Sequence, residues 1–115
     1  MEMRTLGRTG LRVSLVGLGC NNFGERLDLA GTRAVIDAAF DAGVTFFDTA
    51  DSYGKLGGSE TLIGEVLGAR RKEVVLGTKF STPMDARKTY RDASRGYIMA
   101  AVEASLRRLR TDWID

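Results

Sequence analysis

Three polar side chains of the kinds that move protons stand at or just beyond the ends of apolar segments in this 115-residue chain. Asp48 ends the segment 44–48, Lys79 ends the segment 73–79, and Tyr53 follows Asp48 in the chain. A phenol gives up its proton more readily beside a cation, and a carboxylate can orient that cation and compensate its charge. The three residue types together predict a proton-donating centre in which Tyr53 hydrogen-bonds a substrate carbonyl and protonates its oxygen.

Each of these side chains also has a purely structural interpretation. Asp48 could accept hydrogen bonds from the following turn, Lys79 could extend from a strand end into solvent, and Tyr53 could be a loop aromatic. For any one residue alone, the structural interpretation is favoured. Their convergence favours the catalytic interpretation, because parallel strands in a βα fold direct all their carboxyl ends to one face.

The segments that must position these residues alternate between strand and helix patterns. Buried parallel strands are predicted for three short apolar runs, at residues 15–19, 44–48 and 73–79. Three helices are predicted to follow capping residues, from Asp28 to about Ala42, from Ser59 to about Leu67, and from Ser94 to Leu109. The alternation predicts right-handed βαβ units, which leaves open both a closed barrel and an open doubly wound sheet.

Other segments complete the predicted architecture. The glycine-containing loop 7–10 predicts a hairpin, and the segment 80–93, which holds the only proline, predicts a long polar loop. Trp113–Asp115 is expected to start a fourth strand. In the last helix, residues repeated at intervals of three and four predict a continuous core-facing stripe of Ile98, Ala101, Val102, Ser105, Leu106 and Leu109.

Composition places the chain among soluble globular domains, with 43% hydrophobic residues and a net charge of +2. The basic clusters at 70–72 and 107–110 are expected at helix C-termini and on solvated faces, so no nucleic-acid partner is expected. Every apolar run falls short of the roughly 20 residues that cross a bilayer, so no membrane partner is expected either. The single cysteine, Cys20, and the absence of an apolar leader predict a reduced, cytoplasmic setting.

Two motifs surround the proton-donating residues. The first is Phe-Asp-Thr-Ala-Asp-Ser-Tyr-Gly at 47–54, followed by Ser59-Glu60, and the second is Gly77-Thr78-Lys79. With the opening segment 6–11, the run 15–19 and the segment 105–115, these motifs resemble the aldo-keto reductase superfamily over essentially the whole chain.

The resemblance implies an α/β fold, the (β/α)8 TIM barrel. Residues 1–115 would form the N-terminal part of a single barrel domain, comprising a hairpin, three βα units and the start of strand four. The family reduces small-molecule aldehydes or ketones to alcohols with NADPH (NADP), and NAD is the alternative cofactor. Asp48, Tyr53 and Lys79 would take three places in the family's catalytic tetrad, with Tyr53 as the general acid.

The cofactor would lie beside the first barrel strand. By the same resemblance, the backbone of Gly19, Cys20 and Asn21 borders the nicotinamide ribose, next to Asp48. No metal site is predicted. Two other functions stay open, a cofactor-sensing regulatory subunit resembling potassium-channel β subunits and a barrel fragment without activity.

The sequence departs from the family at its fourth tetrad member, a histidine placed just after strand four, because it contains no histidine. A complete barrel takes about 250 residues, and the family's main phosphate-binding segment lies in its later strands. The sequence is therefore expected to be part of a longer reductase and nearly inert alone. Its open strand edges are expected to favour self-association.

Overall fold

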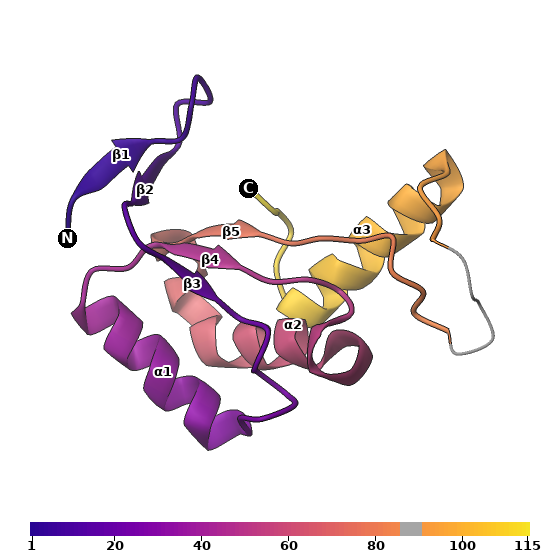
Figure 1. Ribbon diagram of the computed structural model, residues 1–115, viewed down its shortest axis with the longest axis horizontal. Coiled ribbons are helices and arrows are strands. Elements are labelled where there is room, and N and C mark those ends of the chain that lie inside the picture. Colours follow the sequence, from indigo (N-terminus) through magenta and orange to yellow (C-terminus); the bar gives the residue numbers. More distant parts are fainter. Residues whose placement is uncertain (86–90) are drawn as a thin grey trace.

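The computed structural model describes residues 1–85 and 91–115. The hairpin strands are β1 (Met3–Thr5) and β2 (Arg12–Ser14), and the remaining elements are β3 (Gly17–Gly19), α1 (Leu29–Asp41), β4 (Phe46–Asp48), α2 (Tyr53–Leu67), the 3-10 helix η1 (Gly68–Glu73), β5 (Val75–Gly77) and α3 (Arg95–Leu109). Figure 1 shows the hairpin projecting from a small sheet, with α1 and α2 along one side of that sheet. The predicted hairpin and the alternation of strands and helices are confirmed.

The parallel sheet has the order β3-β4-β5, so each new strand is added beside the preceding one. Both crossover helices, α1 and α2, cover the same side (Figure 1). An open doubly wound sheet places helices on both faces, whereas a barrel keeps them all outside. Three strands added in this order with both helices on one side fit a barrel, and they fit one half of an open doubly wound sheet equally well.

Each strand of this sheet has three residues, fewer than the apolar run that predicted it. The extended backbone continues past the paired residues through single hydrogen bonds. The amide of Cys20 donates to the Asp48 carbonyl at 2.9 Å, and the amide of Thr49 donates to the Gly77 carbonyl at 2.9 Å. The carboxyl ends of the strands are therefore tied to one another just where the polar residues begin.

Two helices begin at the capping residues that the sequence predicts. The Asp28 carboxylate accepts a hydrogen bond from the Gly31 amide at 2.9 Å, and the Ser94 hydroxyl accepts one from the Tyr97 amide at 3.3 Å. Each side chain satisfies one of the amides that lack an intrahelical partner at a helix start.

The helix α2 spans Tyr53–Leu67, but its right-handed part begins only after residue 57, close to the predicted start, whereas the predicted capping role of the Ser59 side chain is wrong. The first part of α2 is a left-handed turn at residues 54–57, in which Lys55 has a φ of 60° and Leu56 a φ of 67°. The Ser59 hydroxyl is fully buried and donates to the Cys20 carbonyl oxygen at 2.8 Å. A tertiary contact therefore takes the side chain that looked like a helix cap in the sequence.

The hydrophobic core lies between the sheet and its helices. Phe47 of β4, Leu76 of β5, Ile36 of α1 and Ile63 of α2 are all fully buried. Complete burial of one such side chain contributes about 1.5–3 kcal/mol to folding. This core holds the three strands as one layer, and the polar residues project from its carboxyl end.

Helix α3 packs closely on α2 at Gly64, where an added Cβ would lie 2.6 Å from the backbone of Arg108 and of Leu109. Gly64→Ala is expected to lower the free energy of unfolding by about 1–2 kcal/mol, because overpacking outweighs the gain of about 1 kcal/mol in helix propensity. Urea denaturation of this chain measures the difference. The matched control is Gly96→Ala in α3, where an added Cβ meets nothing within 4 Å and stability should rise. A Gly64→Ala variant as stable as the parent would contradict this close packing.

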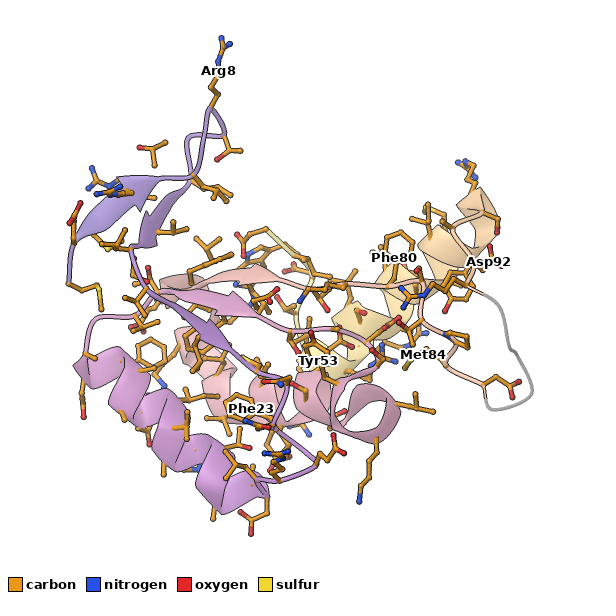
Figure 2. All side chains as sticks on the ribbon, viewed as in Figure 1. Arg8, Phe23, Tyr53, Phe80, Met84 and Asp92 are labelled. Atoms are coloured by element: carbon orange, nitrogen blue, oxygen red, sulfur yellow. The ribbon has the colours of Figure 1, made fainter. Side chains whose placement is uncertain are left out.

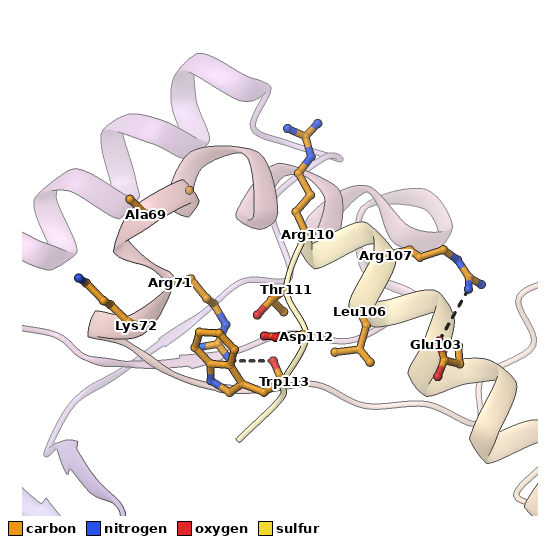
Figure 3. Close-up of a pocket in the computed structure, with 11 residues that line it drawn as sticks. Ala69, Arg71, Lys72, Glu103, Leu106, Arg107, Arg110, Thr111, Asp112 and Trp113 are labelled. Carbon is orange, nitrogen blue, oxygen red and sulfur yellow. Dashed lines mark hydrogen bonds and ion pairs between the residues drawn. The ribbon is translucent and has the colours of Figure 1, made fainter.

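One predicted surface residue is buried. Arg71, expected on a solvated face, is 6% exposed and donates to the carbonyl oxygens of Val74 and Trp113, each at 3.0 Å. It also pairs with the Asp115 carboxylate at 2.8 Å. The bond to Trp113 is drawn in Figure 3. A planar guanidinium with several donors can satisfy this cluster of acceptors at once, which offsets the cost of burying its charge.

Two further predictions about the C-terminal part need correction. Val102 of the predicted core-facing stripe is 40% exposed, and the buried line on α3 runs through Ser105 and Leu109. Trp113–Asp115 is not a strand, although the Asp115 amide donates to the Leu76 carbonyl of β5 at 3.2 Å. In the predicted loop 80–93, the described residues contain no helix or strand, and residues 86–90 lie outside the described residues.

Candidate active site

An acid and an amine meet at the carboxyl end of the sheet. Asp48 is the last residue of β4, and Lys79 lies two residues beyond the end of β5. The Lys79 Nζ lies 2.6 Å from Asp48 Oδ1 and 3.0 Å from the Thr49 carbonyl oxygen. Both charged side chains are about half exposed, at 48% and 47%, so the pair is accessible to a ligand at this rim.

Tyr53 joins this pair from the first position of α2. The Lys79 Nζ is 5.1 Å from the centre of its ring, and Figure 2 shows Tyr53 beside the ends of the strands. Burial is the largest influence on Lys79 and lowers its pKa, but the hydrogen bond and charge of Asp48, together with Tyr53, outweigh it and raise the pKa above its ordinary value. Lys79 is therefore cationic at neutral pH, as a partner for a phenol requires.

The residues predicted to border a cofactor follow the neighbouring strand. Gly19 pairs in register with Asp48 and is exposed, and a Cβ built on it would meet nothing within 4 Å. Asn21 is also exposed. This strand end beside the Asp48–Lys79 pair is therefore open to a ligand.

Cys20, between these two residues, has a fully buried side chain within the hydrophobic core. Burial raises the pKa of its thiol to about 12, and the nearby Asp48 carboxylate adds to the increase. The thiol is therefore neutral at physiological pH and is not a nucleophile. The predicted cofactor contact at Cys20 does not fit this structure, because the whole residue is buried and its amide and carbonyl are bonded to Asp48 and Ser59.

Sequence reasoning gave no role to Glu60, although it belongs to the quoted motif. Its side chain is fully buried, its Oε1 accepts a hydrogen bond from the Thr78 hydroxyl at 2.6 Å, and its Oε2 accepts one from Arg108 Nε at 2.7 Å. The expectation that Arg108 lies on a solvated face is therefore wrong, because this guanidinium turns inward to the carboxylate. The signal in the sequence is the spacing that places Glu60 on the same helical face as Ile63 and Leu67.

Asp51 is a second buried carboxylate beside the site. It is 2% exposed, and within the described part of the chain neither of its oxygens accepts a hydrogen bond. Burial raises its pKa, and the negative charge of Glu60 raises it further. The side chain borders a cavity of about 180 Å³ that Met84 and Tyr97 also line.

This environment predicts a pH-dependent stability that Asp51→Asn removes. Unfolded Asp51 ionises near its ordinary pKa of 3.8, whereas the folded chain holds the proton to higher pH. The ionised form therefore opposes folding at neutral pH, and this penalty fades as the pH falls through the folded pKa and is gone below 3.8. Urea midpoints at pH 7 and pH 4.5 should show the parent gaining stability relative to the variant on acidification. A difference that is the same at both pH values would contradict the prediction.

A cavity of about 760 Å³ lies elsewhere, between η1 and the end of α3 (Figure 3). It is at the amino-terminal end of β5, whereas Lys79 follows the carboxyl end. Three arginines on its wall are paired with carboxylates: Arg71 with Asp115, Arg107 with Glu103, and Arg110 with Glu65. Lys72 also lines this cavity, so its wall carries charges of both signs.

None of the helices among residues 1–85 and 91–115 has both the length and the apolar character needed to cross a lipid bilayer.

Comparison with known proteins supports the barrel. The sequence model of the Aldo/keto reductase family matches residues 15–115. All of this chain aligns with the uncharacterized oxidoreductase YrpG of Bacillus subtilis, at 43% identity over 125 residues, and with the probable voltage-gated potassium channel subunit beta of Oryza sativa, at 38% identity over 123 residues. The chain covers 38% and 36% of those proteins.

A solved structure gives the same result for the fold. The aldo-keto reductase AKR11C1 from Bacillus halodurans, in its holo form, superposes with a TM-score of 0.90 at 38% identity, over all of this chain and 38% of that one. The predicted fold class is therefore confirmed: the structure is α/β, and its strands and helices form part of a TIM barrel. By sequence and by fold, the chain belongs to the aldo/keto reductase family.

Proposed function

We propose that this chain carries the proton-donating centre of a reductase that converts small aldehydes or ketones to alcohols with NADPH. The observation that supports this proposal most directly is the Lys79 ammonium, 2.6 Å from the Asp48 carboxylate and 5.1 Å from the centre of the Tyr53 ring. A cation beside the phenol favours release of its proton. A carbonyl oxygen bound at Tyr53 would receive that proton as the carbonyl carbon is reduced.

The other residues hold this centre and a cofactor in place. Asp48 orients Lys79 and balances its charge, and the Thr49 carbonyl accepts a second hydrogen bond from the same ammonium. The exposed strand end at Gly19, together with Asn21, would border the nicotinamide, which supplies the hydride when it is bound. NADH is the alternative cofactor.

The proposed activity requires more of a barrel than these three βα units. We assign residues 1–115 to the N-terminal part of one barrel domain, with the rest of the cofactor site in later strands. A cytoplasmic location fits the proposal, because reduced nicotinamide cofactors are consumed inside the cell.

The test compares the chain alone with the chain extended to a complete barrel. The complete barrel is expected to oxidise NADPH in the presence of small aldehydes or ketones, as followed by nicotinamide absorbance, and the chain alone is expected to be nearly inactive. Parallel assays with NADH determine the cofactor preference. A folded barrel that binds NADPH but reduces none of a broad panel of aldehydes and ketones would contradict the proposal.

A second candidate function rests on the 38% identity to the rice potassium channel subunit beta. In that case the barrel would bind the cofactor as a sensor and associate with a channel. Pull-down of a potassium channel's cytoplasmic domain by the complete barrel tests this association, and retention only in the presence of NADPH would favour the sensor. Calorimetry with NADPH tests the remaining alternative, an inert fragment, which would release no binding heat.

A further inference from the structure

Two adjacent residues of α2 contact the carboxyl ends of all three parallel strands. The Ser59 hydroxyl donates to the carbonyl of Cys20, just after β3, at 2.8 Å. Because its only proton is used there, the hydroxyl of Thr49, just after β4, is the donor in the 2.9 Å bond between the two. Glu60 accepts from Thr78, just after β5, at 2.6 Å. One point of one helix thus holds the strand ends that carry the candidate active site.

Burying the Glu60 carboxylate costs free energy, so packing alone does not explain a glutamate at this position. Its carboxylate is fully buried and is compensated by Arg108 at 2.7 Å and Thr78 at 2.6 Å. Well-packed apolar side chains of similar volume often give equal or greater stability than a buried ion pair. Stability alone therefore does not favour a carboxylate here, whereas charge-assisted hydrogen bonds fix their partners in direction as well as distance.

The geometry points to Glu60 as a positioning residue that acts through Thr78 on Lys79. Successive side chains of an extended strand point to opposite faces, so a hydroxyl anchored on one face fixes the direction of the next side chain on the other. Glu60 anchors Thr78 toward the helices, and Lys79 then reaches Asp48 and Tyr53. This inference rests on the proposed function, because it concerns the same proton-donating centre.

The test is Thr78→Val in the complete barrel, which removes the hydroxyl and keeps the shape of the side chain. We expect kcat to fall about tenfold or more, because small displacements of reacting groups are costly, while KM for the aldehyde and Kd for NADPH stay within about twofold. We also expect the pH dependence of kcat to shift, because the ammonium beside Tyr53 is displaced. Thr78→Ser retains the hydroxyl and should restore kcat to within about twofold of the parent.

The matched control is Thr61→Val, the same chemical change on the same helix. The Thr61 hydroxyl donates within α2, to the Gly57 carbonyl at 2.8 Å, so its loss should leave kcat and the pH profile unchanged. If Thr78→Val behaves like Thr61→Val, the inference is overturned. If Thr78→Val fails to fold, Glu60→Gln, which keeps the shape and removes the charge, should show the same fall in kcat and the same pH shift. An unchanged rate and profile in Glu60→Gln would overturn the inference equally.

Tyr53→Phe, measured alongside, separates this inference from the function on which it rests. An active Tyr53→Phe barrel would refute the proposed acid. An inactive one, together with unaffected Thr78→Val and Glu60→Gln variants, would refute only the positioning role of Glu60.

Discussion

Tyr53→Phe in the complete barrel is expected to lower kcat by about 10²–10⁴-fold, the range in which general acid catalysis contributes to rates. The substitution removes one hydroxyl and leaves the ring over which Lys79 lies, so Kd for NADPH should change little. Steady-state oxidation of NADPH with an aldehyde measures kcat and KM, and fluorescence titration measures Kd. A loss confined to kcat would mark an interaction made in the transition state.

The chain offers a matched control in Tyr97 of α3. The Tyr97 hydroxyl donates to the Thr82 carbonyl at 3.2 Å, so it is bonded to the loop after β5. Tyr97→Phe should therefore keep kcat within about twofold of the parent, since it removes a hydroxyl without a proposed role in proton transfer. Equal losses in Tyr53→Phe and Tyr97→Phe would indicate a general effect of hydroxyl removal and would contradict the assignment of Tyr53.

Lys79→Met is expected to lower kcat by about 10²-fold or more, because the phenol loses the cation that favours release of its proton. Methionine keeps an unbranched stem and removes the charge. The loss should persist from pH 6 to pH 10, because Lys79, whose pKa is raised above its ordinary value of 10.5, stays cationic in the parent over that range. The measurement is kcat from pH 6 to pH 10 for parent and variant.

Measuring thermal stability distinguishes a loss of proton transfer in Lys79→Met from unfolding of the variant. The Lys79–Asp48 pair is about half exposed, and exposed ion pairs contribute about 0–1 kcal/mol to stability. The Lys79→Met barrel should therefore melt within a few degrees of the parent. Lys72→Met, at an exposed lysine of η1, is the control and should leave kcat unchanged. A Lys79→Met variant with parental kcat across the pH range would remove Lys79 from the proposed centre.

The parts of the fold that local patterns determine could be predicted from the sequence. Asp48 ends an apolar run, and β4 ends there too, while Asp28 and Ser94 cap the helices that follow them. The meeting of Asp48 with Lys79 followed from a general rule, that parallel strands finish on one face.

The predictions that were wrong concern side chains whose bonding partners lie far away in the sequence. Ser59 resembles a helix cap locally, but its hydroxyl bonds a carbonyl 39 residues away. Glu60 and Arg108 are 48 residues apart, and Arg71 and Asp115 are 44 apart. No local periodicity indicates that a charged side chain will be matched inside the fold, so these arginines were expected in solvent.

The left-handed turn that follows Tyr53 has a backbone conformation that suits D-amino acids better than L-amino acids. L-amino acids lose roughly 1–2 kcal/mol each in a left-handed helical conformation, and both Lys55 and Leu56 adopt it. For their mirror images the same backbone is the relaxed one. Both side chains are exposed, so D-lysine and D-leucine introduced there by chemical synthesis would keep the turn and relieve its strain. Tyr53 would then be presented by a segment of inverted handedness, which ordinary proteases do not cleave.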